Sequence, residues 1–184
     1  MVLTMNEKKW KTLSRRLAFK TRIAKVYFDH VRLPNGTEIK DYTVVELPSY
    51  VKLVPIDKRG RVLLQREYRH AVDRYMWETC GGFIDKGESP VRSARRELEE
   101  ETGYAGGSFR LIGKISDYGS TSPHTGFIVL ARGVSRLKKP HREDTESISK
   151  VTAVSVPRLR RMIKRGELEN SSAIAALAIS GILF

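Results

Sequence analysis

The stretch GFIDKGESPVRSARRELEEETGY, residues 82–104, decides how the rest of this sequence is interpreted. A glycine corner, Gly81-Gly82, stands at its start, Ser89-Pro90 follows, and Gly103 lies near its end. Serine is a favourable helix N-cap, proline is tolerated in the first turn, and glycine commonly ends a helix. The sequence therefore predicts a helix over residues 90–102.

This predicted helix carries four carboxylates within five residues, and three of them share one face. Glu97, Glu100 and Glu101 are related as i, i+3 and i+4. Like charges at this spacing repel, and Mg²⁺ is a natural compensation because it prefers carboxylate oxygens. A second stripe is apolar and marks the side that faces the core: Val91, Ala94 and Leu98.

Two arginines offset part of this repulsion, Arg95 and Arg96. Glu88, in the loop before the helix, is a candidate partner for Arg96. Taken alone, a run of glutamates is more often a solvated helix face than a metal site. The glycine corner before the helix and the apolar stripe along it favour the metal interpretation here.

The spacing of this stretch matches a known motif. Gly82, five residues, Glu88, seven residues and then the run from Arg96 to Tyr104 fill every fixed position of the Nudix box. The chain therefore resembles the Nudix hydrolases. Because both long spacings and all the fixed positions agree, this signal is far more specific than a lone glycine motif.

The likeness extends beyond the box to the ADP-ribose pyrophosphatase branch of that family. Residues 31–36, residues 62–69 and the tail over residues 162–177 are similar to that branch, so the likeness covers about residues 20–178. One departure is the corner Thr79-Cys80-Gly81-Gly82, where the branch usually has Leu-Pro-Ala-Gly. This departure bears on the nucleotide preference rather than on the metal site.

The resemblance implies a fold and an assembly. The fold class is α/β, a Nudix α/β/α sandwich with a mixed sheet and an N-terminal antiparallel β extension. Residues 1–45 are expected to form that extension, and residues 46–184 the Nudix hydrolase domain. In the resembling branch the extension builds a homodimer and lends residues to the partner's site, so a homodimer is expected here.

The resemblance also implies metal ligands and catalytic residues. Glu97 and Glu101 are the expected principal ligands of Mg²⁺ or Mn²⁺, with Glu100 in support and the Gly81 carbonyl completing the shell. Arg96 and Glu100 are counted among the catalytic residues. Two or three such cations would neutralise a diphosphate and activate a water.

The general base is expected from a late acidic loop, where Glu143, Asp144 and Glu146 compete and Glu146 is favoured. The alternative for these residues is a solvated acidic turn. Substrate contacts are expected from two residues before the box, Arg69 and Glu78, and from Gly82 and Glu88 within it. An ion pair within the sheet is the alternative for Arg69 and Glu78.

The expected activity is Mg²⁺-dependent hydrolysis of ADP-ribose or a related nucleotide sugar to a nucleoside monophosphate and a sugar phosphate. Three alternatives stay open: GDP-mannose or another sugar nucleotide, an RNA 5′ end, and a Nudix-fold nucleotide-binding module without turnover. The clustered glutamates argue against the module, because a protein without turnover has no need of a metal site.

Charge and composition agree with an anionic substrate. Lys and Arg number 34 against 21 Asp and Glu, a net charge of +13. The excess gathers in residues 1–25 and 132–165, but the second region has no aromatic residue to stack on bases, so nucleic acid is the lesser expectation. The single cysteine and the lack of a signal-peptide or membrane-spanning segment favour a cytoplasmic protein of 184 residues.

The remaining segments are expected as follows. Residues 1–16 are weakly patterned and are predicted as a frayed arm, a strand follows from about Ala18, and Pro34-Asn35-Gly36 is predicted as a hairpin turn. Ser171 or Ser172 is expected to cap a last helix toward Ile182. Cys80 is expected to be a small buried residue, and the polar loop over residues 117–126, with His124, either a lid or a plain surface loop.

Overall fold

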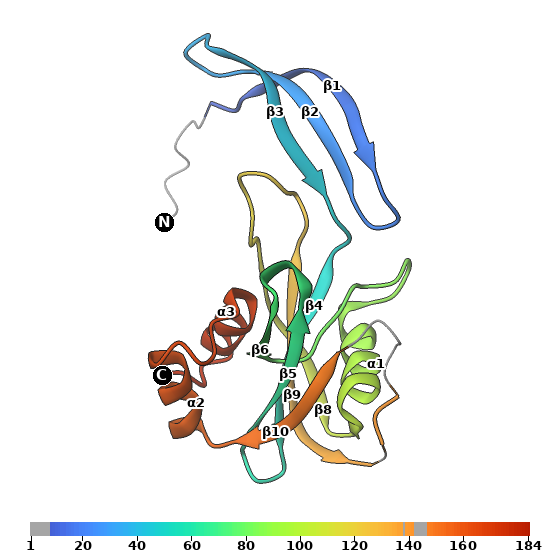
Figure 1. Cartoon of the computed structure of the whole chain (residues 1–184), viewed down its shortest axis with the longest axis vertical. Coiled ribbons are helices and arrows are strands. Elements are labelled where there is room, and N and C mark those ends of the chain that lie inside the picture. The colour runs from blue at the N-terminus through green and yellow to red at the C-terminus, as the bar shows by residue number, and fades with distance from the viewer. Residues whose placement is uncertain (1–7, 138, 142–146) are drawn as a thin grey trace. The chain divides into compact units, whose positions relative to one another are not determined.

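The computed structural model describes residues 8–137, 139–141 and 147–184 (Figure 1). The chain divides into two compact units. One comprises Met1–Pro48 with Tyr118–His124, and the other comprises Ser49–Asp117 with Thr125–Phe184.

The first unit is built on an antiparallel sheet of three strands in the described residues, β1 (Lys11–Lys20), β2 (Lys25–Arg32) and β3 (Glu38–Glu46). The frayed arm predicted for residues 1–16 is therefore wrong from Lys11 onward. Almost all of β1 is exposed, so burial does not alternate along it, and its place comes from backbone pairing with β2. The predicted turn is confirmed, since Gly36 has φ +87° and donates its N–H to the Leu33 carbonyl at 3.0 Å.

A loop segment from further along the chain packs in this unit. The Val45 N–H on β3 donates to the Thr121 carbonyl at 2.7 Å, and the Tyr42 hydroxyl bonds to the Ser120 carbonyl. His124 is buried, and its Nδ1 lies 2.6 Å from the Ser122 hydroxyl. The loop is thus tied to β3 by hydrogen bonds rather than lying free on the surface.

The second unit contains a mixed sheet, as predicted. In the described residues it has seven strands, in the order β10-β5-β4-β9-β7, with β6 beside β5 and β8 beside β9. The pairing of β4 with β9 is parallel and the other pairings are antiparallel. A 3₁₀ turn, η1 (His70–Val72), joins β5 to β6. The strand bounds are β4 (Tyr50–Asp57), β5 (Val62–Arg69), β6 (Arg74–Glu78), β7 (Tyr104–Ala105), β8 (Ser108–Ile115), β9 (Gly126–Arg136) and β10 (Ile148–Val154).

Helices cover both faces of this sheet (Figure 1). On one side α1 (Pro90–Thr102) buries Ala94 and Leu98 in a core with Leu53 and Leu63. On the other, α2 (Val156–Lys164) and α3 (Ser171–Ile179) pack over a second core with Val54 and Leu64. Alternate residues of β4 and β5 thus serve opposite cores, which makes the three layers. In the part of the chain that the structure describes, no helix is both long and apolar enough to cross a membrane.

The caps of α1 agree with the sequence prediction. The Ser89 hydroxyl accepts the Arg92 N–H at 3.3 Å, and Gly103 ends the helix with φ +71° and an N–H bond to the Glu99 carbonyl at 2.9 Å. The expected cap of α3 is wrong. Asn170 rather than Ser171 or Ser172 caps it, its Oδ1 accepting the Ala173 N–H at 2.9 Å, and asparagine is as favourable an N-cap as serine.

Candidate active site

The corner before α1 lies directly against β4. The Val51 N–H donates to the Gly82 carbonyl at 2.9 Å, and the Leu53 N–H donates to the Cys80 carbonyl at 3.0 Å. Gly81 has φ +152°, and a Cβ there would lie 2.1 Å from the Val51 carbonyl oxygen. Only glycine fits this close approach. From the described residues the Gly81 carbonyl accepts no hydrogen bond, so its oxygen is available to a ligand.

Two glutamates of α1 lie at this corner. Glu101 accepts the Gly81 N–H on Oε2 at 3.0 Å and the Gln65 amide on Oε1 at 3.1 Å. Glu97 lies beside Gly82, where an added Cβ would meet Glu97 Oε1 at 2.3 Å. Both carboxylates are buried, with 7% of Glu97 and 3% of Glu101 exposed. The structure thus brings together Gly81, Gly82, Glu97 and Glu101, which the sequence singled out.

Burial disfavours the charged form of these carboxylates when no cation is bound. Burial of Glu101 raises its pKa to about 8, and the charge of Glu97 adds to this, although the Gln65 amide acts in the opposite direction. Burial therefore disfavours the charged form of Glu101, and a bound cation would favour that form again.

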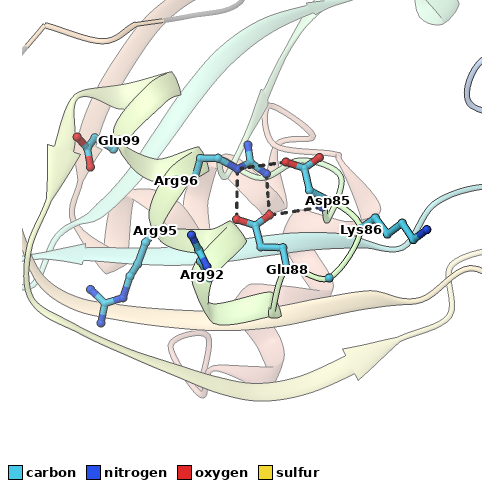
Figure 2. A pocket seen from close by; sticks show the side chains of 8 residues that line it. Asp85, Lys86, Glu88, Arg92, Arg95, Arg96 and Glu99 are labelled. Atoms are coloured by element: carbon cyan, nitrogen blue, oxygen red, sulfur yellow. Dashed lines mark hydrogen bonds and ion pairs between the residues drawn. The ribbon is translucent and has the colours of Figure 1, made fainter.

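Arg96 orients two carboxylates of α1, Glu97 and Glu100. Glu88 orients Arg96 in turn, and Figure 2 shows this pairing. Arg96 Nη1 donates to Glu97 at 2.8 Å and to Glu100 at 3.1 Å, and Arg96 Nη2 donates to Glu88 at 3.1 Å. The expected pairing of Glu88 with Arg96 is confirmed. Burial lowers the pKa of Arg96, but the bonds to Glu88 and Glu97 outweigh it and the pKa is raised, while the Arg96 bond lowers the pKa of Glu88.

Two concavities adjoin this part of α1. The larger, about 590 Å³, lies along the loop that leads into the helix, and Figure 2 shows the side chains around it. Its lining residues are Asp85, Lys86, Gly87, Glu88, Arg92, Arg95, Arg96 and Glu99. The smaller, about 380 Å³, is lined by Arg96, Glu99, Glu100 and His141. Glu100 therefore faces a space that a small ligand could enter, beside the arginine that orients it.

A buried charge network stands next to the corner. The carboxylate of Glu78 is wholly buried and accepts from Lys52 Nζ at 2.5 Å and from Arg69 Nε at 2.8 Å. Burial raises the pKa of Glu78, but the two cations outweigh burial and lower it to about 2. Arg69 also contacts Glu67 at 3.0 Å and keeps 40% of its side chain exposed, so it can still reach a ligand.

Other predicted residues are placed differently, or not at all. Within the described residues, no three His, Cys, Asp or Glu side chains gather as a ready-made metal site, and Glu100 bonds to Arg96. The expected general bases Glu143, Asp144 and Glu146 lie outside the described residues. Cys80 is buried as expected, and burial raises its pKa, which disfavours the reactive thiolate.

The sequence interpretation missed three buried polar residues, Lys52, Gln65 and Glu67. Their signal was present. Lys52 lies among apolar residues of β4, and Gln65 and Glu67 follow the apolar start of β5. A buried polar side chain requires a partner. The partners themselves come from other elements, and the sequence does not name them.

This geometry agrees with the comparison of the chain with known families. The NUDIX domain model matches residues 47–177, and the chain belongs to this family. It is a Nudix hydrolase. Residues 10–45 match a second model, the nucleoside diphosphate sugar hydrolase N-terminal domain.

Relatives match over nearly the whole chain. An ADP-ribose pyrophosphatase of Bacillus subtilis is 28% identical, over 91% of this chain and 90% of its own length. One of Mycobacterium tuberculosis is 29% identical, over 94% of this chain and 84% of its own length. A solved structure described as an ADP compounds hydrolase is 21% identical, with a TM-score of 0.81 over 96% of this chain and 95% of that chain. The expected α/β/α fold is thereby confirmed.

Proposed function

We propose that this protein is a Mg²⁺-dependent pyrophosphohydrolase that cleaves ADP-ribose or a related nucleotide sugar. The observation that carries the proposal is the pair of buried carboxylates, Glu97 and Glu101, held against the Gly81-Gly82 corner. The full-length likeness to proteins named ADP-ribose pyrophosphatase supports the substrate class. Water attacks one phosphorus of the diphosphate, the bridging P–O bond breaks, and a nucleoside monophosphate and a sugar phosphate leave.

The donor set fits a hard divalent cation. Glu97, Glu101 and the Gly81 carbonyl offer oxygen ligands only, which Mg²⁺ and Mn²⁺ accept. Burial raises the pKa of Glu101, and a bound cation would offset this because it favours the ionised carboxylate. When bound, the metal supplies charge for the diphosphate and activates water. Arg96 orients Glu97 and Glu100 from within the same helix. Substitution of Glu101 by Gln tests the site, because the amide keeps the shape and loses the charge.

Arg69 serves as the phosphate contact in this proposal. Its guanidinium is anchored on one side by the buried Glu78 and by Glu67, and its exposed part presents further N–H donors. A planar guanidinium suits phosphate oxygens because it donates two parallel bonds. Glu78 then acts by fixing Arg69 and not by touching the substrate. The Arg69→Lys variant, which keeps the charge and loses the fork, should raise KM more than it lowers kcat.

For the general base we keep Glu146, with Glu143 as the second candidate. Single Gln variants separate them: loss of kcat with unchanged Mg²⁺ affinity identifies the base, and wild-type kcat in both variants overturns this part of the proposal. The fall of kcat at low pH provides a second criterion, because a carboxylate base must be ionised to accept the proton.

One substrate panel tests the whole proposal. ADP-ribose, GDP-mannose, other nucleotide sugars, dinucleoside polyphosphates and 5′-triphosphorylated RNA are compared with Mg²⁺, with Glu101→Gln as the inactive control. Preference for ADP-ribose that the variant abolishes supports the proposal. Preference for RNA with a steep salt dependence would replace the substrate class, and no turnover on any of them would favour a binding module.

We also propose that residues 1–45 form a dimerisation element. Large apolar side chains of the first unit are exposed, among them Leu17 and Phe19 on β1 at 49% and 61%. Exposed apolar groups of this size on one strand are typical of a surface that another copy covers. Light scattering on the wild type and on Leu17→Arg tests this, and a monomeric wild type would refute it.

A further inference from the structure

Gln65 on β5 is a buried amide between two carboxylates. It is 1% exposed, and its Nε2 donates to Glu67 Oε2 and to Glu101 Oε1, both at 3.1 Å. A side-chain NH₂ group carries two protons, so both donors are used. The opposite orientation would turn the amide oxygen toward two carboxylates, so the neighbours fix the orientation of the amide.

As a result Glu101 is held at both oxygens by elements other than its own helix. Oε2 accepts from the Gly81 N–H at 3.0 Å, and Oε1 accepts from Gln65 on the central sheet. Two donors at the two oxygens of one carboxylate fix its position and its plane. The corner supplies the first donor through the backbone, and the Gln65 side chain supplies the second.

The other end of the same amide shows that packing does not account for Gln65. Among the described residues, Gln65 Oε1 is buried without a hydrogen-bond partner, as is the hydroxyl of Thr79. An unsatisfied buried acceptor costs about 1–3 kcal/mol. An apolar side chain of similar size would fill this place without that cost, so the amide's contribution lies in its donors.

We propose that Gln65 is a positioning residue, which fixes the Glu101 carboxylate in the orientation that binds a divalent cation. This inference rests on the proposed function, because it takes Glu101 as a metal ligand. Gln65 itself does not touch the metal or the substrate. Residues that hydrogen-bond a metal ligand typically contribute about 10–100-fold to metal affinity.

A calorimetric titration of the full-length protein with Mn²⁺ alone tests the inference without any substrate. Gln65→Met removes both donors and keeps the length of the side chain, and it should weaken the Mn²⁺ Kd about 10-fold or more while the Tm changes by only a few degrees. Thr79→Val is the matched control. It removes the other unpartnered buried polar atom of the described residues and leaves both Glu101 bonds in place, so its Kd should equal that of the wild type.

Turnover provides a second readout. At saturating Mn²⁺ the Gln65→Met variant should recover most of its kcat, because the ligand is misaligned and not removed, whereas Glu101→Gln should stay inactive. If Gln65→Met does not fold, Gln65→Leu takes its place in both measurements.

The outcomes separate the two proposals. If the wild type binds Mn²⁺, Glu101→Gln binds it weakly and Gln65→Met binds it as the wild type does, the inference is overturned and the proposed function stands. If Thr79→Val weakens binding as much as Gln65→Met does, a general loss of packing explains the effect and the inference is again overturned. If Glu101→Gln binds Mn²⁺ as tightly as the wild type, the proposed metal site itself fails.

Discussion

Replacing Gly82 by alanine should disable the site without unfolding the protein. Gly82 does not have a positive φ, so its backbone accepts alanine without strain. The new Cβ would lie 2.3 Å from Glu97 Oε1, against about 3.4 Å for an ordinary contact. The obstacle is the end of a flexible side chain, so the Glu97 carboxylate can withdraw by about 1 Å while the backbone keeps its place.

The size of the effect follows from that displacement. Misplacing a functional group by about 1 Å costs on the order of 100-fold in rate, equivalent to about 2.7 kcal/mol of transition-state stabilisation. We therefore expect kcat/KM on ADP-ribose to fall about 100-fold in Gly82→Ala, with a Tm within a few degrees of the wild-type value. Steady-state kinetics at several Mg²⁺ concentrations and thermal unfolding measure the two quantities.

Two further glycine variants show whether the explanation is right. Gly106→Ala introduces strain at φ +73° with nothing within 4 Å of the new Cβ, so it should lower the Tm and leave kcat/KM unchanged. Gly81→Ala would bring a Cβ against the Val51 carbonyl and should impair folding. Wild-type kcat/KM in Gly82→Ala, or a fall in its Tm as large as that of Gly81→Ala, would refute the reasoning.

Further predictions concern stability, pH and metal. Leu98→Ala removes a wholly buried side chain of α1 and should lower the free energy of unfolding by about 2–5 kcal/mol in urea titration. Glu78 has a pKa of about 2 in the folded protein and 4.5 as its ordinary value, so it contributes about 3 kcal/mol of stability above pH 4.5 that is lost as the pH falls toward 2. Comparing urea unfolding at about pH 6 and about pH 3 should show a smaller difference in Glu78→Gln than in the wild type, and an equal difference would contradict this assignment. Removal of divalent metal with EDTA should abolish turnover, and added Mg²⁺ should restore it; turnover that persists in EDTA would contradict the proposed site.

The part of the site that the sequence predicts is the part whose determinants are local. The bounds and both caps of α1, its apolar stripe and the pairing of Glu88 with Arg96 all depend on residues within one short stretch. Their spacing alone places them relative to one another. The same holds for the turn at Gly36, whose left-handed backbone suits glycine.

What the sequence does not predict depends on partners far along the chain. Lys52 and Glu78 are 26 residues apart, and Gln65 and Glu101 are 36 apart, so neither pair has a spacing that marks it. Strand β1 escapes prediction for a related reason. It is exposed along almost its whole length, so burial does not alternate along it, and its pairing with β2 is what makes it a strand.

The parallel pairing of β4 with β9 has a consequence for how the protein folds. Tyr50 pairs with Gly126, so this ladder closes a loop that contains the whole of the box and α1. The chain must close this long loop before the contacts between β4 and β9 can form, so such pairings form slowly. The Gly81-Gly82 corner bonds to β4, while the helix that follows it, α1, packs against β9. We therefore expect turnover to return only in the last phase of refolding, after most of the helical circular dichroism signal has returned.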